Sequence, residues 1–211
     1  EADPVRADLA AFQICSGLCL FTVAIGGARE MYFPTTTATT AEDKVYKLNS
    51  VSEFLAIVGF VFQFWDFFVS LTIDEHRTAI MLLHHALAGT TCWMCVKYRS
   101  LQYFGVFFLG GTEISSIFLV VVDLARFFPP LEGSVFSMVV GVCQPLFACS
   151  FLYYRGVLWW VKSAELWRAV IVANPQRETF RPGLGWVVAV FLFVDVVLGL
   201  LQVYERRAKR A

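Results

Sequence analysis

The chain has 211 residues, of which 58% are hydrophobic and only 16% are charged, and its formal net charge is zero. A water-soluble domain cannot hide that much apolar surface, so the composition excludes an ordinary soluble protein and indicates a polytopic membrane protein. The neutral charge gives no electrostatic basis for nucleic-acid binding, and we expect no nucleic-acid partner. Because the chain begins with Glu1 and not with Met, we expect a presequence, a signal peptide or a further tail upstream.

The elements predicted from hydropathy are all helices. About 20 apolar residues suffice for a helix to cross a bilayer, and six stretches reach that length. In chain order they lie at about residues 9–28, 51–73, 78–96, 101–122, 135–161 and 184–204. The predicted fold class is therefore all-α, a polytopic membrane helical bundle with about six transmembrane helices.

The connections divide the chain into three parts. Residues 1–49 hold the first transmembrane helix and a polar, threonine-rich loop, residues 50–205 form the main helical membrane domain, and residues 206–211 are a basic tail. Trp159 and Trp160 end the fifth stretch, and we expect them at a membrane–water interface, where amphipathic rings prefer to lie. Basic residues are nearly balanced between the two sides of the bundle, so the positive-inside rule leaves the orientation open.

One face of the second stretch consists only of small or polar residues, spaced alternately four and three apart. These residues are Ser52, Ala56, Gly59, Gln63, Asp66 and Ser70. Small residues let membrane helices approach closely, so this stripe predicts a helix–helix seam. Asp66 needs a partner or water in addition, because a carboxylate is costly in hydrocarbon.

Further ionisable groups interrupt the later apolar stretches. Adjacent helical residues point about 100° apart, so one of the neighbouring histidines His84 and His85 can face the centre of the bundle while the other faces a neighbouring helix. Glu113 and Ser116 are one turn apart and share a face. Such groups usually face a bundle interior and mark a site. We predict a polar, lipid-binding cavity formed by Gln63, Asp66, His84, His85, Glu113, Ser116, Arg155 and Asp195.

A purely architectural role for these groups stays open. Asp195 would then pair with Arg155 or with a histidine, since a buried ion pair is often structural. The histidines would be neutral core residues that form hydrogen bonds with Glu113, Thr90 or Thr91.

Cofactor chemistry is limited by the residue count. Three histidines cannot build a histidine-rich di-iron site, and the adjacent pair cannot ligate both faces of a haem, which leaves only a single axial ligand to a haem or pigment. No nucleotide-binding loop, dinucleotide fingerprint or nucleophile elbow is present. We expect no metal and no cofactor, with bound phospholipid or sphingolipid as the ligand.

The order and spacing of these residues resemble the TLC family (TRAM–LAG1–CLN8 homology) over about residues 50–205. The resemblance rests on Phe64-Trp65-Asp66, on Met81-Leu82-Leu83-His84-His85, on Glu113-Ile114-Ser115-Ser116-Ile117-Phe118-Leu119, and on Phe147-Ala148-Cys149-Ser150-Phe151 with Arg155. It implies a helical bundle with a central cavity that is accessible to lipid.

The best-known enzymes of that family are ceramide synthases, which transfer an acyl group from acyl-CoA to a sphingoid amine. The resemblance implies a histidine base, so the catalytic candidates are His84, His85 and Glu113. The His-Asp element of those enzymes is missing from the stretch around Glu113. The chain therefore resembles the non-synthase branch, and a non-enzymatic role is favoured.

Three functions follow as expectations. The first is a TLC-like integral membrane protein that binds or organises membrane lipid without catalysis. The second is a structural accessory subunit of a large organellar complex, respiratory or photosynthetic, with other membrane subunits as partners. The third is an acyl-CoA-dependent lipid N-acyltransferase. The expected location is the endoplasmic reticulum or an organellar inner membrane, mitochondrial or plastid.

Overall fold

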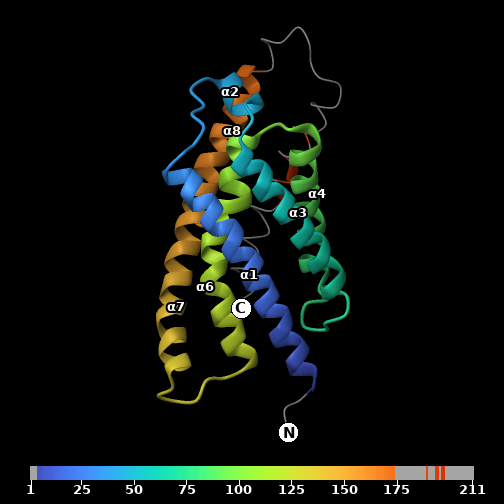
Figure 1. Cartoon of the computed structure of the whole chain (residues 1–211), viewed down its shortest axis with the longest axis vertical. Coiled ribbons are helices and arrows are strands. Elements are labelled where there is room, and N and C mark those ends of the chain that lie inside the picture. Colours follow the sequence, from blue (N-terminus) through green and yellow to red (C-terminus); the bar gives the residue numbers. More distant parts are fainter. Residues whose placement is uncertain (1–3, 174–188, 190–192, 195, 198–211) are drawn as a thin grey trace.

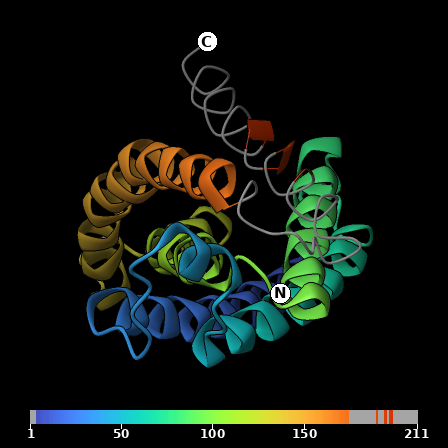
Figure 2. The ribbon, with the colours of Figure 1, turned by 90° about the horizontal axis from the view of Figure 1, so that it is seen from above.

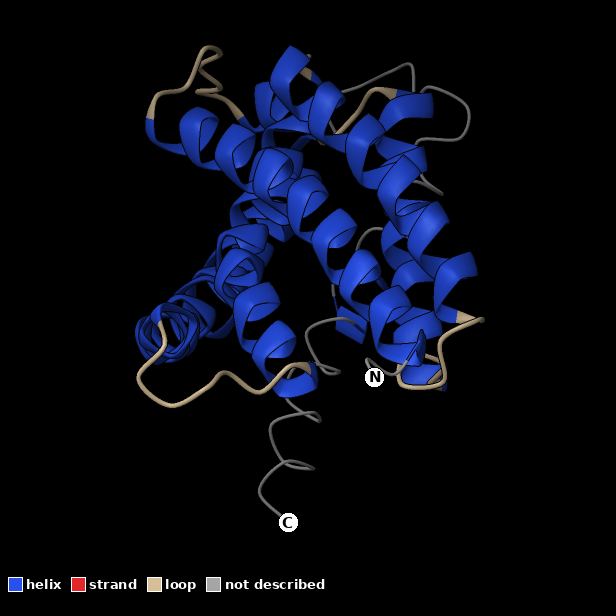
Figure 3. Cartoon of the chain, turned by 60° about the horizontal axis from the view of Figure 1, so that its bottom comes forward, coloured by secondary structure: helices blue, strands red, loops and turns tan. Residues whose placement is uncertain are grey.

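The computed structural model describes residues 4–173, 189, 193–194 and 196–197, and within these residues it contains helices and no strand (Figure 3). The helices are α1 (Pro4–Tyr32), α2 (Ala41–Tyr46), α3 (Ser50–Ser70), α4 (Ala79–Tyr98), α5 (Gln102–Gly105), η1 (Val106–Gly110), η2 (Gly111–Glu113), α6 (Ile114–Phe127), α7 (Val135–Phe151), η3 (Leu152–Leu158) and α8 (Trp159–Ala173). η1 and η3 are π-helical, and η2 is a 3₁₀ turn.

By length and composition, five of the described helical segments can cross a membrane. They are Ala7–Tyr32, Ala41–Ser70, Ala79–Tyr98, Gln102–Phe127 and Val135–Ala173. These segments match the first five predicted spans, which confirms the all-α membrane bundle. Of the sixth predicted span, residues 184–204, only 189, 193–194 and 196–197 belong to the described part of the chain.

The fifth segment is longer than predicted. α7, η3 and α8 follow one another without a break over 39 residues. At about 1.5 Å per residue this segment is roughly 58 Å long, about twice the ~30 Å thickness of a hydrocarbon core. One end of the segment must therefore stand outside the hydrocarbon.

Polar side chains start several of the helices. Thr40, Asn49, Thr78 and Ser134 each accept a hydrogen bond from the backbone N–H three residues later. Such caps satisfy one of the N–H groups that a helix leaves unpaired at its start. The caps therefore explain where α2, α3, α4 and α7 begin.

The helices form a curved row in which each packs on the next. α4 contacts α3, α3 contacts α1, α1 contacts α6, and α6 contacts α7. Seen from above, α7–α8, α1, α3 and α4 follow an arc around the segment that contains α6 (Figure 2). At one end of the bundle the short α2 packs on α8, far from the N-terminal end of α1 (Figure 1).

The small-residue stripe of α3 is a packed helix–helix seam, as predicted. Ser52, Ala56, Asp66 and Ser70 are all buried. A Cβ on Gly59 would lie 3.0 Å from the Cys92 sulfur of α4. This close packing brings the polar residues of α3 against those of α4.

α1 crosses η1 and η2 at backbone contact distance. A Cβ added to Gly27 would lie 2.5 Å from the Cα and the carbonyl carbon of Gly110. Only glycine fits at this crossing, because any side chain would overlap the other backbone. The crossing holds α1 against the segment that leads into Glu113.

Candidate functional site

Two cavities inside the bundle meet at one polar centre. One has an empty volume of about 780 Å³ and the other of about 1110 Å³, and in both cases this volume includes space that is open to the surroundings. The residues that line both are Leu20, Phe62, Gln63, His84, Glu113 and Arg155. These side chains come from α1, α3, α4, the η2–α6 junction and η3, so the packing of distant segments creates the centre.

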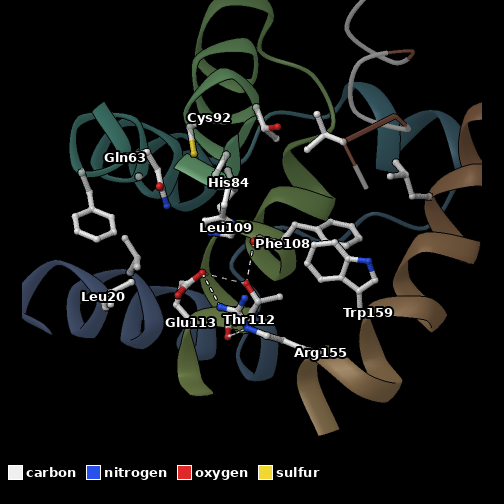
Figure 4. A pocket seen from close by; sticks show the side chains of 17 residues that line it. Leu20, Gln63, His84, Cys92, Phe108, Leu109, Thr112, Glu113, Arg155 and Trp159 are labelled. Atoms are coloured by element: carbon white, nitrogen blue, oxygen red, sulfur yellow. Dashed lines mark hydrogen bonds and ion pairs between the residues drawn. The ribbon is translucent and has the colours of Figure 1, made fainter. Parts of the chain in front are cut away.

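An ion pair between Arg155 and Glu113 lies at the centre (Figure 4). Arg155 Nη2 is 3.1 Å from Glu113 Oε1, and the two side chains are only 13% and 20% exposed. Ser116 Oγ donates to Glu113 Oε2 at 2.6 Å and accepts from Arg155 Nη2 at 3.1 Å. The pair and the hydroxyl thus satisfy one another, as ionisable groups inside a membrane protein must.

Irregular helix turns supply the remaining contacts of Arg155. Its Nε donates to the Thr112 carbonyl oxygen and to Ser115 Oγ, both at 3.3 Å. Thr112 lies in the 3₁₀ turn η2, directly after the π-helical η1, and Arg155 lies in the π-helical η3. π-Helical turns are rare and occur frequently at functional sites. Here Arg155 lies within one π-helical turn, η3, and Glu113 follows the other, η1, by three residues.

His84 faces the shared space between the two cavities (Figure 4). Among the described residues no side chain or backbone group forms a hydrogen bond with its ring. The ring meets that of His85 edge-on, with centroids 5.4 Å apart. His84 can therefore donate to, or accept from, a molecule in the cavity.

His85 points instead toward α3. Its Nδ1 is 2.7 Å from Gln63 Oε1, and because this oxygen only accepts, Nδ1 is the donor. Its Nε2 is 3.6 Å from Asp66 Oδ1, which also accepts a hydrogen bond from Ser70 Oγ at 3.0 Å. The two histidines thus face different directions, as the predicted rotation along the helix requires.

The TLC domain family model matches residues 11–204 of the chain. The chain belongs to the TLC domain family. No curated protein and no solved structure matches it. The match begins in α1, so it includes the helix that crosses η1 and η2 at Gly27.

The structure brings seven of the eight predicted cavity residues of this TLC domain together. Gln63, Asp66, His84, His85, Glu113, Ser116 and Arg155 line one cavity or both. Asp195 lies outside the described residues, so its predicted pairing with Arg155 is not tested. Among the described residues, the acidic partner of Arg155 is Glu113.

Glu113, Thr90 and Thr91 were the predicted hydrogen-bond partners of the histidines. This prediction was wrong for His85, whose ring forms its hydrogen bond with Gln63. Thr90 and Thr91 donate to the backbone oxygens of Ala86 and Leu87, one turn earlier in α4. Threonine in a helix often bonds to the preceding turn in this way.

The side chain of Trp159, which was predicted at a membrane–water interface, faces the interior of the protein. Its side chain is buried, lines the smaller cavity and packs edge-on against Phe108 with ring centroids 4.9 Å apart. Within the described part of the TLC domain, no group of three or more His, Cys, Asp or Glu side chains is placed to hold a metal ion.

Proposed function

We propose that this TLC domain protein binds a membrane lipid in its central cavity and performs no chemistry on it. The observation that carries the proposal is the meeting of two cavities at the Arg155–Glu113 centre, beside the ring of His84, which lines both cavities. Ligand sites are typically concave and largely apolar, with a few convergent polar groups.

The two cavities suit different parts of an amphiphilic molecule. The smaller one is walled mainly by apolar side chains such as Phe108, Leu109 and Trp159, and it suits an acyl chain. The larger one adds Gln13 and Ser16 to the polar centre and suits a headgroup with hydrogen-bonding atoms. A lipid would thus have its polar group near His84 and its chain against Trp159.

The contacts of the ionisable groups favour binding over catalysis. Glu113 is held by Arg155 and Ser116, so it is not a free acid. A histidine base is normally oriented by a third group on its other nitrogen. Among the described residues, His84 has no such partner. These contacts support a role for His84 in holding a polar headgroup.

Lipid retention after purification tests the proposal. We expect the protein in mild detergent to carry a phospholipid or sphingolipid that mass spectrometry of the extracted sample detects. Ala88 lines the smaller cavity, so Ala88→Trp should displace the chain. Val142, which is 59% exposed on α7, provides the control Val142→Trp. Retention that is absent from the wild type, or equal in both variants, would contradict the proposal.

Acyl transfer is the second candidate function, and the placement of His84 in the cavity favours it. A histidine within reach of a bound amine can take its proton during attack on a thioester. The test is an assay with acyl-CoA and a sphingoid base. Turnover that is lost in His84→Ala and kept in His85→Ala would establish this function in place of simple binding.

An accessory role in an organellar membrane complex is supported by the outward face of α7. Val135, Met138 and Val142 are apolar and exposed, so a partner subunit or lipid must cover them. We place the protein in the endoplasmic reticulum or an organellar inner membrane under this proposal. Migration as a lone small protein on native gels of membranes solubilised in mild detergent would contradict the accessory role.

A further inference from the structure

A third hollow lies on the outer surface of the bundle, between α3 and α4. It has an empty volume of about 920 Å³, which includes space open to the surroundings, and its aromatic walls are made by Phe60, Phe64, Phe67, Phe68 and Trp93. Phe64, Phe68 and Trp93 are 58%, 52% and 41% exposed. α3 and α4 both belong to segments that are long and apolar enough to cross a membrane, so in a bilayer these rings would face acyl chains. We call this hollow the α3–α4 groove.

The floor of the α3–α4 groove is the outer wall of the central site. Gln63 and His85 line the groove and also line the larger cavity, and Gln63 lines the smaller cavity as well. The 2.7 Å hydrogen bond between these two side chains is therefore part of the partition between bilayer and polar centre. Gly89, also on the floor, adds no side chain to that partition.

Opening the partition breaks the hydrogen bond between Gln63 and His85, so both side chains then need other polar neighbours. His85 Nε2 lies 3.6 Å from Asp66 Oδ1 on the inner side, which is too far for a hydrogen bond but places a polar group beside the ring within the cavity. The Gln63 amide likewise faces both cavities. Polar groups inside a membrane need such alternative partners, because none are available from lipid chains.

We propose that the α3–α4 groove is the lateral port through which the acyl chain of a membrane lipid passes between the bilayer and the central cavity, with the Gln63–His85 hydrogen bond as its gate. The port rests on the proposed lipid binding in the cavity. The occupant is an acyl chain because the walls are aromatic, the groove lies within two membrane spans, and its polar floor leads to the headgroup site.

The test uses the full chain in vesicles that contain phosphatidylcholine with a photoactivatable diazirine in one acyl chain. After illumination, mass spectrometry locates adducts in the groove, at Phe64 or Trp93, and in the cavity, at Phe108 or Trp159. Ala86 lines the groove and is exposed, so Ala86→Trp should block it. Leu83 is 47% exposed on the same helix and does not line the groove, so Leu83→Trp is the matched control.

We expect Ala86→Trp to reduce the rate of cavity labelling about tenfold, which corresponds to a raised barrier of roughly 1.4 kcal/mol, while Leu83→Trp labels like the wild type. Cavity labelling that is equal in both variants overturns the port and leaves lipid binding intact. Wild-type protein with groove adducts but without cavity adducts overturns the proposed function, and the port with it.

A disulfide across the floor of the groove provides a second variant, and its reduced form serves as the folding control. A Cβ on Gly89 would lie 3.4 Å from the Gln63 Cβ, close to the separation of about 3.5–4.5 Å between Cβ atoms in disulfides. The pair Gln63→Cys with Gly89→Cys should therefore bridge the groove floor when oxidised. Cavity labelling should be low in the oxidised protein and recover on reduction, whereas Gly89→Cys alone should show no such change. Equal labelling of the oxidised and reduced pair overturns the port.

Discussion

The substitution Glu113→Gln tests the polar centre most directly. It removes the negative charge beside Arg155 while keeping nearly the same side-chain shape. The Arg155 side chain is 13% exposed and lies 3.1 Å from the carboxylate that would be lost. The variant therefore leaves a buried positive charge without its counter-charge.

The expected cost follows from the contacts that remain. Removal of one partner of a buried ion pair typically costs about 3–5 kcal/mol. Arg155 would retain the Thr112 carbonyl and the hydroxyls of Ser115 and Ser116 as acceptors. We therefore expect the lower end of that range, about 3 kcal/mol.

The assay is equilibrium unfolding in mixed micelles, and the matched control is the ion pair Arg99–Glu53. Its side chains are 51% and 29% exposed, so Glu53→Gln should cost less than about 1 kcal/mol. The double variant Glu113→Gln with Arg155→Met should recover most of the loss, because it removes both charges. A cost of Glu113→Gln that is no greater than that of Glu53→Gln would refute a buried ion pair at the centre of the bundle.

Three further predictions concern other parts of the fold. Gly27→Ala should destabilise the protein by about 1–3 kcal/mol through overlap with η1, whereas Gly141→Ala in α7 should change thermal unfolding little, because no described atom lies within 4 Å of the added Cβ. Glu165 holds Lys44 and Lys162 at 2.7 Å each, so Glu165→Gln should raise hydrogen exchange in α2; unchanged exchange would show that α2 docks on α8 without these charges. Burial lowers the pKa of His76 from its ordinary value of 6.5; Glu75 opposes this shift and Arg126 adds to it. Because the unfolded chain then binds the proton more readily, stability should fall as the pH drops below about 6.5, and His76→Gln should flatten that part of the profile relative to the wild type.

Local rules were sufficient for the helices and for contacts within one turn. Backbone N–H and C=O groups in hydrocarbon must pair within their own segment, so a long apolar stretch has few alternatives to a helix. The first five predicted spans accordingly agree with the structure. The Ser116–Glu113 hydrogen bond also follows from a spacing of three residues on one helix.

Similar stripes of small and polar residues are buried in one helix and exposed in another. The stripe of α3 is a buried seam. In α7, Gly141, Gln144 and Ala148 have the same kind of spacing, yet they are exposed. Periodicity shows that residues share a face, but it does not show which neighbour that face meets. Only the packing of α3 on α4 and of α7 on α6 decides this.

By itself, the sequence determined that this is a membrane-spanning helical bundle with ionisable groups inside it, because chain composition and helix geometry are local properties. The tertiary structure decided that Arg155 pairs with Glu113, 42 residues away, that His84 and not His85 lines both cavities, and that Trp159 lines the smaller one. Each of these outcomes depends on how one helix is rotated against another. That rotation is set by side-chain packing between distant segments, which no single stretch of sequence contains.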